Sequence, residues 1–171
     1  ALLVLLLGAC SPRQMIVGSL ADELAGQAQG SESDLDMLRD AAPFHLKLSE
    51  SILSRQPGHQ ALAESVAAGF TQYAYAFVAF EVEQVESRDA KAAERLRQRA
   101  AKLYARAHLH AMRALELAEP GFAARLASTQ PAEWPRLRAE QAGLAYWAAA
   151  SWRGWLSLSK DAPEAAADVP V

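Results

Sequence analysis

Apolar residues recur every three or four positions along most of this chain, and that spacing predicts helices. A short amphipathic helix is expected within residues 11–28, and longer helices are expected over about 34–56, 60–86, 89–118 and 132–158. The 60–86 segment has the clearest apolar stripe along one face: Leu62, Val66, Phe70, Tyr73, Phe77 and Phe80. The chain is therefore predicted to be mostly helical.

Residues that interrupt helices separate these segments. The predicted breaks are Pro57-Gly58, Ser87-Arg88-Asp89, Pro120-Gly121 and Thr129-Gln130-Pro131. Residues 122–128 are expected to form a short helical link. Pro43 lies inside the 34–56 segment, where it either kinks one helix or starts the second of two, and the sequence leaves both alternatives open.

The composition agrees with closely packed helices. Alanine is the commonest residue, and no segment alternates between apolar and polar positions as a strand would. We therefore predict an all-α fold of antiparallel helical hairpins that form an α-solenoid or bundle. The runs Tyr104-Ala105-Arg106-Ala107 and Ala114-Leu115-Glu116-Leu117, followed by Pro120, are typical of the second helix of a tetratricopeptide repeat. An elongated, tetratricopeptide-like arrangement is expected.

The N-terminal residues have the pattern of a lipoprotein signal. Residues 1–9 are apolar but too few to span a bilayer, and Gly8-Ala9 directly precedes Cys10, the single cysteine of the chain. We predict that Cys10 is lipidated and anchors the protein in the periplasm. The alternative is that Cys10 is a small buried apolar residue. Ser11, which stands where an Asp would favour the inner membrane, favours the outer membrane.

These patterns predict that the chain has three parts. Residues 1–9 are predicted to be part of a signal peptide, and residues 10–33 a lipid anchor and tether with a short helix. Residues 34–171 are predicted to form the tetratricopeptide-like helical domain. We expect this domain to be truncated at its C-terminus, because residues 161–171 contain no helix stop.

Charge and motifs argue against several function classes. The chain has 17 Lys and Arg against 20 Asp and Glu, so it lacks the basic excess typical of nucleic-acid-binding proteins. His108 and His110 are two positions apart on a helix and point to nearly opposite sides, so they cannot share a metal ion. The segment Ser157-Leu158-Ser159-Lys160 matches the Ser-x-x-Lys pattern of acyl-enzymes, but it falls at a helix end without the partner motifs. We predict no metal, no cofactor and no enzyme activity.

Two of the predicted helices are rich in aromatic side chains. These residues are candidates for lining a ligand cavity between the 60–86 and 132–158 helices, although an aromatic stripe at helical spacing more often forms core. Gly69, Gly143 and Gly154 in the same helices indicate either close backbone approach or room for a ligand. The candidate lining residues are Phe70, Tyr73, Tyr75, Phe77, Tyr146, Trp147, Trp152 and Trp155.

Three segments of the chain match one known pattern: the lipoprotein signal that ends at Cys10 (the lipobox), the helical segment 41–53 and the run from Gly69 to Val78. Together they resemble the T component associated with TRAP (tripartite ATP-independent periplasmic) transporters. The segments 99–117 and 147–160 are similar to it in character. The resemblance implies a periplasmic lipoprotein that associates with the TRAP solute-binding protein. It also implies a hydrophobic cleft for an apolar or organic-acid ligand, and a homo-oligomer, which is a trimer in the family.

Two other functions remain open from the sequence. A helical-repeat scaffold lipoprotein of outer-membrane or pilus assembly would use the same helices for protein contacts alone. A lipid-anchored hydrolase is the third alternative, and it has the weakest support in the motifs. Adjacent genes for a TRAP solute-binding protein and permease would favour the transport function.

Overall fold

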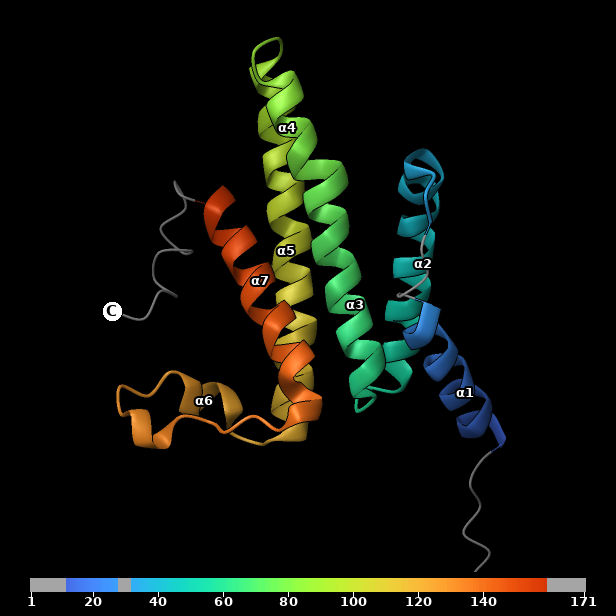
Figure 1. Cartoon of the computed structure of the whole chain (residues 1–171), viewed down its shortest axis with the longest axis vertical. Coiled ribbons are helices and arrows are strands. Elements are labelled where there is room, and N and C mark those ends of the chain that lie inside the picture. The colour runs from blue at the N-terminus through green and yellow to red at the C-terminus, as the bar shows by residue number, and fades with distance from the viewer. Residues whose placement is uncertain (1–11, 28–31, 160–171) are drawn as a thin grey trace, which may run out of the picture.

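The protein is built from helices, as a computed structural model that describes residues 12–27 and 32–159 shows (Figure 1). The described residues contain no strand, so the predicted all-α fold is confirmed. The elements are α1 (Pro12–Gln27), α2 (Leu35–Arg55), α3 (Gln60–Tyr73), the π-helical segment η1 (Ala74–Ala79), α4 (Phe80–Val85), α5 (Ala90–Ala118), α6 (Phe122–Leu126), the 3₁₀ turns η2 (Pro131–Glu133) and η3 (Ala139–Gln141), and α7 (Ala142–Leu158). The predicted signal segment 1–9 and Cys10 lie outside the described residues.

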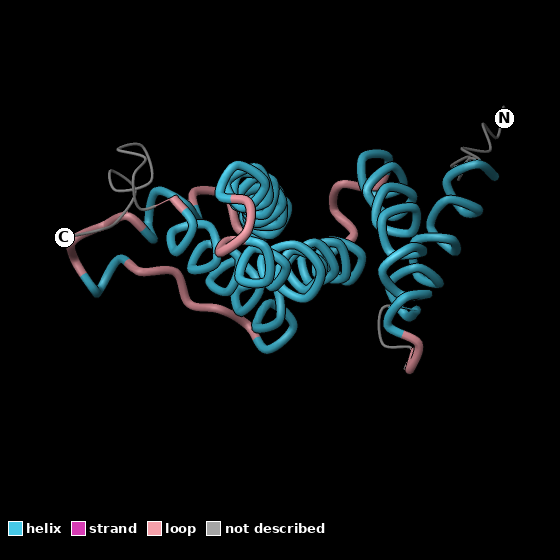
Figure 2. The backbone as a smooth tube through the Cα atoms, turned by 90° about the horizontal axis from the view of Figure 1, so that it is seen from above, coloured by secondary structure: helices cyan, strands magenta, loops and turns pink. Residues whose placement is uncertain are grey.

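Successive long helices run in opposite directions. The continuous rod of α3, η1 and α4 leads into α5, which returns alongside it and also packs along α7 (Figure 1). Helix α2 joins α3 at one end of the molecule and diverges from it toward the other, and α1 contacts both (Figures 1 and 2). The antiparallel hairpins are therefore present, while the tetratricopeptide-like detail stays a prediction.

Local side-chain contacts explain where the helices begin. Asp34 caps α2 by accepting hydrogen bonds from the backbone N–H groups of Asp36 and Met37, both at 3.0 Å. Asp89 accepts from Ala92 N–H at 2.9 Å at the start of α5. Gly121, with φ of 81°, takes the left-handed conformation that follows the end of α5. The predicted breaks at 57–58, 87–89 and 120–121 agree with these ends.

The structure resolves one alternative that the sequence left open and differs from the predictions at two places. Helix α2 continues through Pro43, so the 34–56 segment is one helix. The predicted 60–86 helix contains the π-helical segment η1, in which the Phe80 N–H bonds to the Tyr75 carbonyl five residues back. The prediction of a helix from residue 132 was wrong, because α7 begins only at Ala142. Trp134 has an extended backbone, with ψ of 141°, as expected for a residue that precedes a proline.

The core lies where α3, α5 and α7 meet. Alanines at 0–1% exposure occupy the contact faces of α3 and α5 and let the helices approach closely. Larger side chains fill the remaining space, and the most completely buried of these are Leu62, Val66, Val78, Leu115 and Leu144. The alanine-rich composition is thus explained by helix-to-helix packing.

Two glycines of α7 mark places where a neighbouring helix comes close. A Cβ atom at Gly154 would lie 2.6 Å from the ring of Tyr104 on α5, which is buried. A Cβ at Gly143 would meet the carboxylate of Glu64 on α3. Of the two explanations offered by the sequence, close approach is the one that applies at these positions.

Candidate functional site

A groove with a volume of about 930 Å³ opens between α2 and α3. Small side chains along α3, including Ala61, Ser65 and Ala68, form its floor and leave the space that larger residues would fill, whereas Leu46 of α2 packs closely against Gly69. Helix α2 forms one wall, and Trp147 of α7 reaches the groove past α3. The largest apolar side chains that line it are Leu35, Leu38, Leu46, Tyr73, Phe77 and Trp147. A volume of this size suits a small organic molecule.

The polar groups of the groove are few and carry no positive charge from Lys or Arg. Its lining includes the carboxylates of Glu32 and Glu64 together with Gln72, His45 and Ser49. His45 Nε2 lies 3.5 Å from the Ser49 hydroxyl within α2. The groove is therefore mainly apolar, with an acidic contribution.

The π-helical segment begins at this groove. Tyr73 is the last residue of α3 and Phe77 lies inside η1, and their ring centroids are 5.4 Å apart. The guanidinium of Arg39, on α2, lies 5.5 Å from the centroid of the Phe77 ring. Single π-helical turns within α-helices are frequent at functional sites, because they change which side chains share a face.

The eight aromatic candidates fall into four different environments. Tyr73, Phe77 and Trp147 line the groove. Phe70 is buried in the core, Trp152 and Trp155 are half-buried, and Tyr75 and Tyr146 are exposed at 72% and 63%. The structure therefore brings three of the eight together, and the space they share lies between α2 and α3. The α2 wall of the groove was not among the sequence candidates, although the apolar positions Leu35, Leu38 and Leu46 share one helical face.

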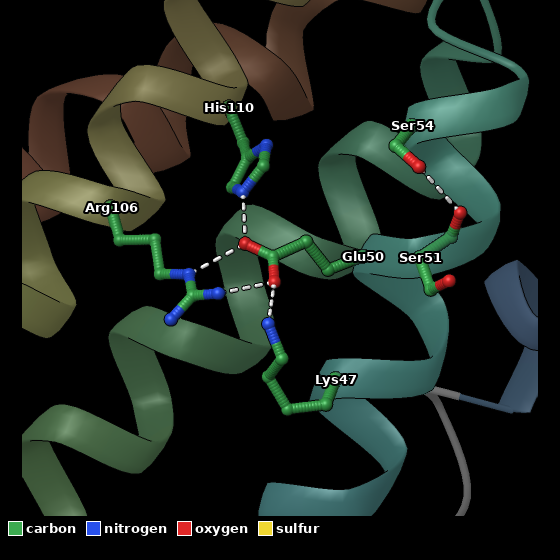
Figure 3. Close-up of polar contacts among 6 residues, drawn as sticks. All are labelled: Lys47, Glu50, Ser51, Ser54, Arg106 and His110. Atoms are coloured by element: carbon green, nitrogen blue, oxygen red, sulfur yellow. Dashed lines mark hydrogen bonds and ion pairs between the residues drawn. The ribbon is translucent and has the colours of Figure 1, made fainter.

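A cluster of charged side chains lies between α2 and α5 (Figure 3). Glu50 of α2 accepts hydrogen bonds from Arg106 Nε at 2.5 Å and from Lys47 Nζ at 2.5 Å. His110 Nε2 lies 2.8 Å from Glu50 Oε1, the oxygen that also accepts from Arg106 Nε, while Lys47 bonds to Oε2. Burial by itself raises the pKa of Glu50, but the hydrogen bonds from Arg106, Lys47 and His110 outweigh it and lower the pKa to about 2. The cluster ties α2 to α5.

Phe70 lies beneath this cluster. The Arg106 guanidinium lies 4.9 Å from the centroid of its ring, and the His110 ring stacks on it with 6.3 Å between centroids. The same two side chains therefore contact both a buried ring and a carboxylate. Sequence reasoning did not single out Glu50, because its partners are 56 and 60 residues away in the chain.

The histidines bond to different helices. His108 Nδ1 lies 2.9 Å from the Ala148 carbonyl on α7, whereas His110 contacts Glu50 on α2. Within residues 12–27 and 32–159, no group of three or more His, Cys, Asp and Glu is placed to hold a metal ion. None of the helices in these ranges has the length and apolar character that crossing a membrane requires.

Comparison with known proteins assigns this chain to a family. The family model for the TRAP transporter T-component matches residues 31–171. The chain belongs to this family. Members of this family are transport-related components of TRAP systems, and this agrees with the resemblance found in the sequence. The match begins just before α2, so it includes both walls of the groove and the Glu50 cluster.

An individual relative of this T-component chain occurs in Treponema pallidum (strain Nichols). It is an uncharacterized protein, 30% identical over 134 residues. The alignment covers 69% of this chain and 42% of the relative, so the chain spans less than half of the relative's length.

Proposed function

We propose that this T-component is a non-enzymatic, periplasmic lipoprotein that binds the TRAP solute-binding protein and receives an apolar ligand in the groove between α2 and α3. The groove is the observation that supports this function best, since it offers about 930 Å³ lined mainly by apolar side chains. The lack of any catalytic or metal-binding cluster among the sequence motifs leaves binding as the chemistry to explain. Membership of the T-component family favours a transport role over a scaffold of outer-membrane or pilus assembly.

The lining of the groove favours an uncharged ligand over an organic acid. A bound carboxylate would leave water and meet Glu32 and Glu64, with no Lys or Arg in the lining to balance its charge. Apolar rings and alkyl chains would instead contact Tyr73, Phe77 and Trp147. We therefore narrow the proposed ligand class to neutral, apolar molecules.

Filling the groove is expected to weaken ligand binding without unfolding the protein. Ala68 lies on the groove floor, so Ala68→Phe should lower the affinity for the neutral fluorescent probe N-phenyl-1-naphthylamine at least tenfold, a change of about 1.4 kcal/mol. Fluorescence titration measures this affinity, and circular dichroism confirms the fold. Ala149→Phe, at an exposed position of α7, is the matched control and should bind as the unmodified protein does. Equal affinities for both variants would show that the probe does not occupy the groove.

Partnership with the solute-binding protein is tested by surface plasmon resonance, with the TRAP solute-binding protein of the same genome immobilised. We expect saturable binding in the micromolar range or tighter, and no binding to an unrelated periplasmic binding protein. If the TRAP solute-binding protein did not bind, either with or without ligand, this part of the proposal would be wrong.

Lipidation of Cys10 places the protein beside the membrane in the proposed function. The chain from Cys10 to Pro12 is short, so acyl chains on Cys10 would hold the start of α1 within about 7 Å of the attachment point. Residues 1–9 would be removed as part of the signal, residues 10–33 would act as anchor and tether, and residues 34–171 would form the binding domain. The mass of the mature N-terminal peptide distinguishes a lipidated Cys10 from an unmodified one.

A further inference from the structure

Positive charge is concentrated on one helix of this acidic protein. Helix α5 contains seven Lys and Arg against two Glu, a formal charge of +5. The rest of the chain has ten Lys and Arg against eighteen Asp and Glu, a formal charge of −8. A partner that approaches α5 therefore meets the opposite sign of charge from the one it meets elsewhere.

Six of the seven cations in α5 share one face. At about 100° per residue, their spacing of four, four, three, four and seven positions keeps them within a sector of about 80°. They form what we call the basic stripe: Lys91, Arg95, Arg99, Lys102, Arg106 and Arg113. From Lys91 to Arg113 the stripe is about 33 Å long, at 1.5 Å per residue.

The cations of the basic stripe have few acidic partners in the described chain. Arg106 is paired with Glu50, and the remaining five form no ion pair among the described residues. The one cation of α5 outside the stripe, Arg97, is paired with both Glu86 and Glu94. Glu116, one turn beyond the stripe, accepts hydrogen bonds from the backbone of Gly121 at 2.6 Å and Ala123 at 3.0 Å. Adjacent like charges destabilise a helix, so the stripe is not explained by the stability of α5.

The basic stripe is accessible and lies beside the ligand groove. Lys91, Arg95, Lys102 and Arg113 are exposed, and a shallow hollow of about 280 Å³ runs along Arg95, Arg99, Lys102 and Arg106. Arg99 donates to the Tyr73 hydroxyl at 3.5 Å, and its guanidinium lies 6.0 Å from the centroid of that ring. Tyr73 also lines the groove, so a partner seated on the stripe would lie next to the groove opening.

We propose that the basic stripe is the docking surface for an acidic patch on the solute-binding protein. This inference rests on the proposed function and adds the surface and its charge. A protein partner has a limited footprint, so it can contact α5 while avoiding the negative charge of the rest of the chain. An anionic membrane surface or a long polyanion would extend over both regions and be repelled by the second. Charge complementarity therefore favours a protein with a matching acidic patch.

Charge reversal tests this surface in the same surface plasmon resonance assay. The stripe variant combines Lys91→Glu, Arg95→Glu and Lys102→Glu, three exposed residues with no ion pair in the described chain. The control variant combines Arg55→Glu, Arg136→Glu and Arg153→Glu, which are also exposed and change the net charge by the same amount. We expect the stripe variant to bind the solute-binding protein at least a hundredfold more weakly, and the control to bind within about threefold of the unmodified protein. Affinity of the unmodified protein should also fall steeply between 50 and 500 mM NaCl, on the order of a tenfold change or more.

The outcomes separate this inference from the proposed function. Equal weakening of both variants, or of neither, while the unmodified protein binds, would overturn the basic stripe and leave the partnership intact. No binding of the unmodified protein would overturn both. If the unmodified protein instead bound vesicles containing phosphatidylglycerol and the stripe variant did not, the stripe would be a membrane contact and the inference would be wrong. Thermal melts of the three proteins establish that each variant folds.

Discussion

Replacing Glu50 with glutamine is expected to lower the free energy of unfolding by about 2–3 kcal/mol at pH 7. The Glu50 side chain is 15% exposed and is surrounded by Arg106, Lys47 and His110. Its pKa of about 2, against an ordinary 4.5, corresponds to roughly 3 kcal/mol of interaction with the charged form. Glutamine keeps the shape and loses the charge, so most of that interaction disappears. Urea unfolding followed by circular dichroism measures the difference.

The pH dependence of this effect has a defined sign. Because folding lowers the pKa of Glu50, its contribution to stability is fully present above about pH 5 and is lost as the pH falls toward about 2. The stabilities of the unmodified protein and of Glu50→Gln should therefore converge on acidification. Glu81→Gln, at an exposed carboxylate on α4, serves as the control and should change stability little at any pH. A constant difference between the two proteins from pH 7 to pH 3 would contradict the assigned interaction.

Truncating Phe70 to alanine is expected to cost about 3–4 kcal/mol of stability. The ring is 3% exposed and is contacted by Arg106 and His110, so its removal leaves a cavity and breaks two aromatic contacts. Urea unfolding measures the loss, and the variant should show a lower midpoint with an unchanged slope.

Tyr75→Ala provides the comparison, because Tyr75 lies five residues further along the same helical rod and is 72% exposed. Its substitution should change stability by less than about 0.5 kcal/mol. If Phe70→Ala instead kept full stability and only reduced probe binding, Phe70 would be a groove residue and its placement in the core would be wrong.

The positions of the helices could be predicted from the sequence because helix formation depends on nearby residues. Asp34 and Asp89 provide N-caps, Gly121 takes the left-handed conformation, and the apolar spacing between them identifies the buried faces. The late start of α7 also has a cause in neighbouring residues. Pro135 disfavours a helical conformation at Trp134, so the sequence itself contains the signal for this late start.

The candidate site could be predicted only in part. Phe70, Tyr73 and Phe77 belong to one apolar stripe, yet the first is core and the other two line the groove. The difference arises because Arg106 and His110 of α5 cover the Phe70 ring, whereas Tyr73 and Phe77 face the groove beside α2. Helical spacing specifies that a face is apolar, but it carries no information about which neighbour covers that face.

The sequence by itself therefore determined the helical class, most helix ends, the apolar stripes and the resemblance to the T-component family. Only the tertiary structure decided that Glu50 bonds to residues 56 and 60 positions away and that the groove opens against α2. The physical reason is the range of the interactions. Helices are fixed by contacts within about four residues, whereas a groove depends on how far two packed helices separate, which contacts distant in the chain determine.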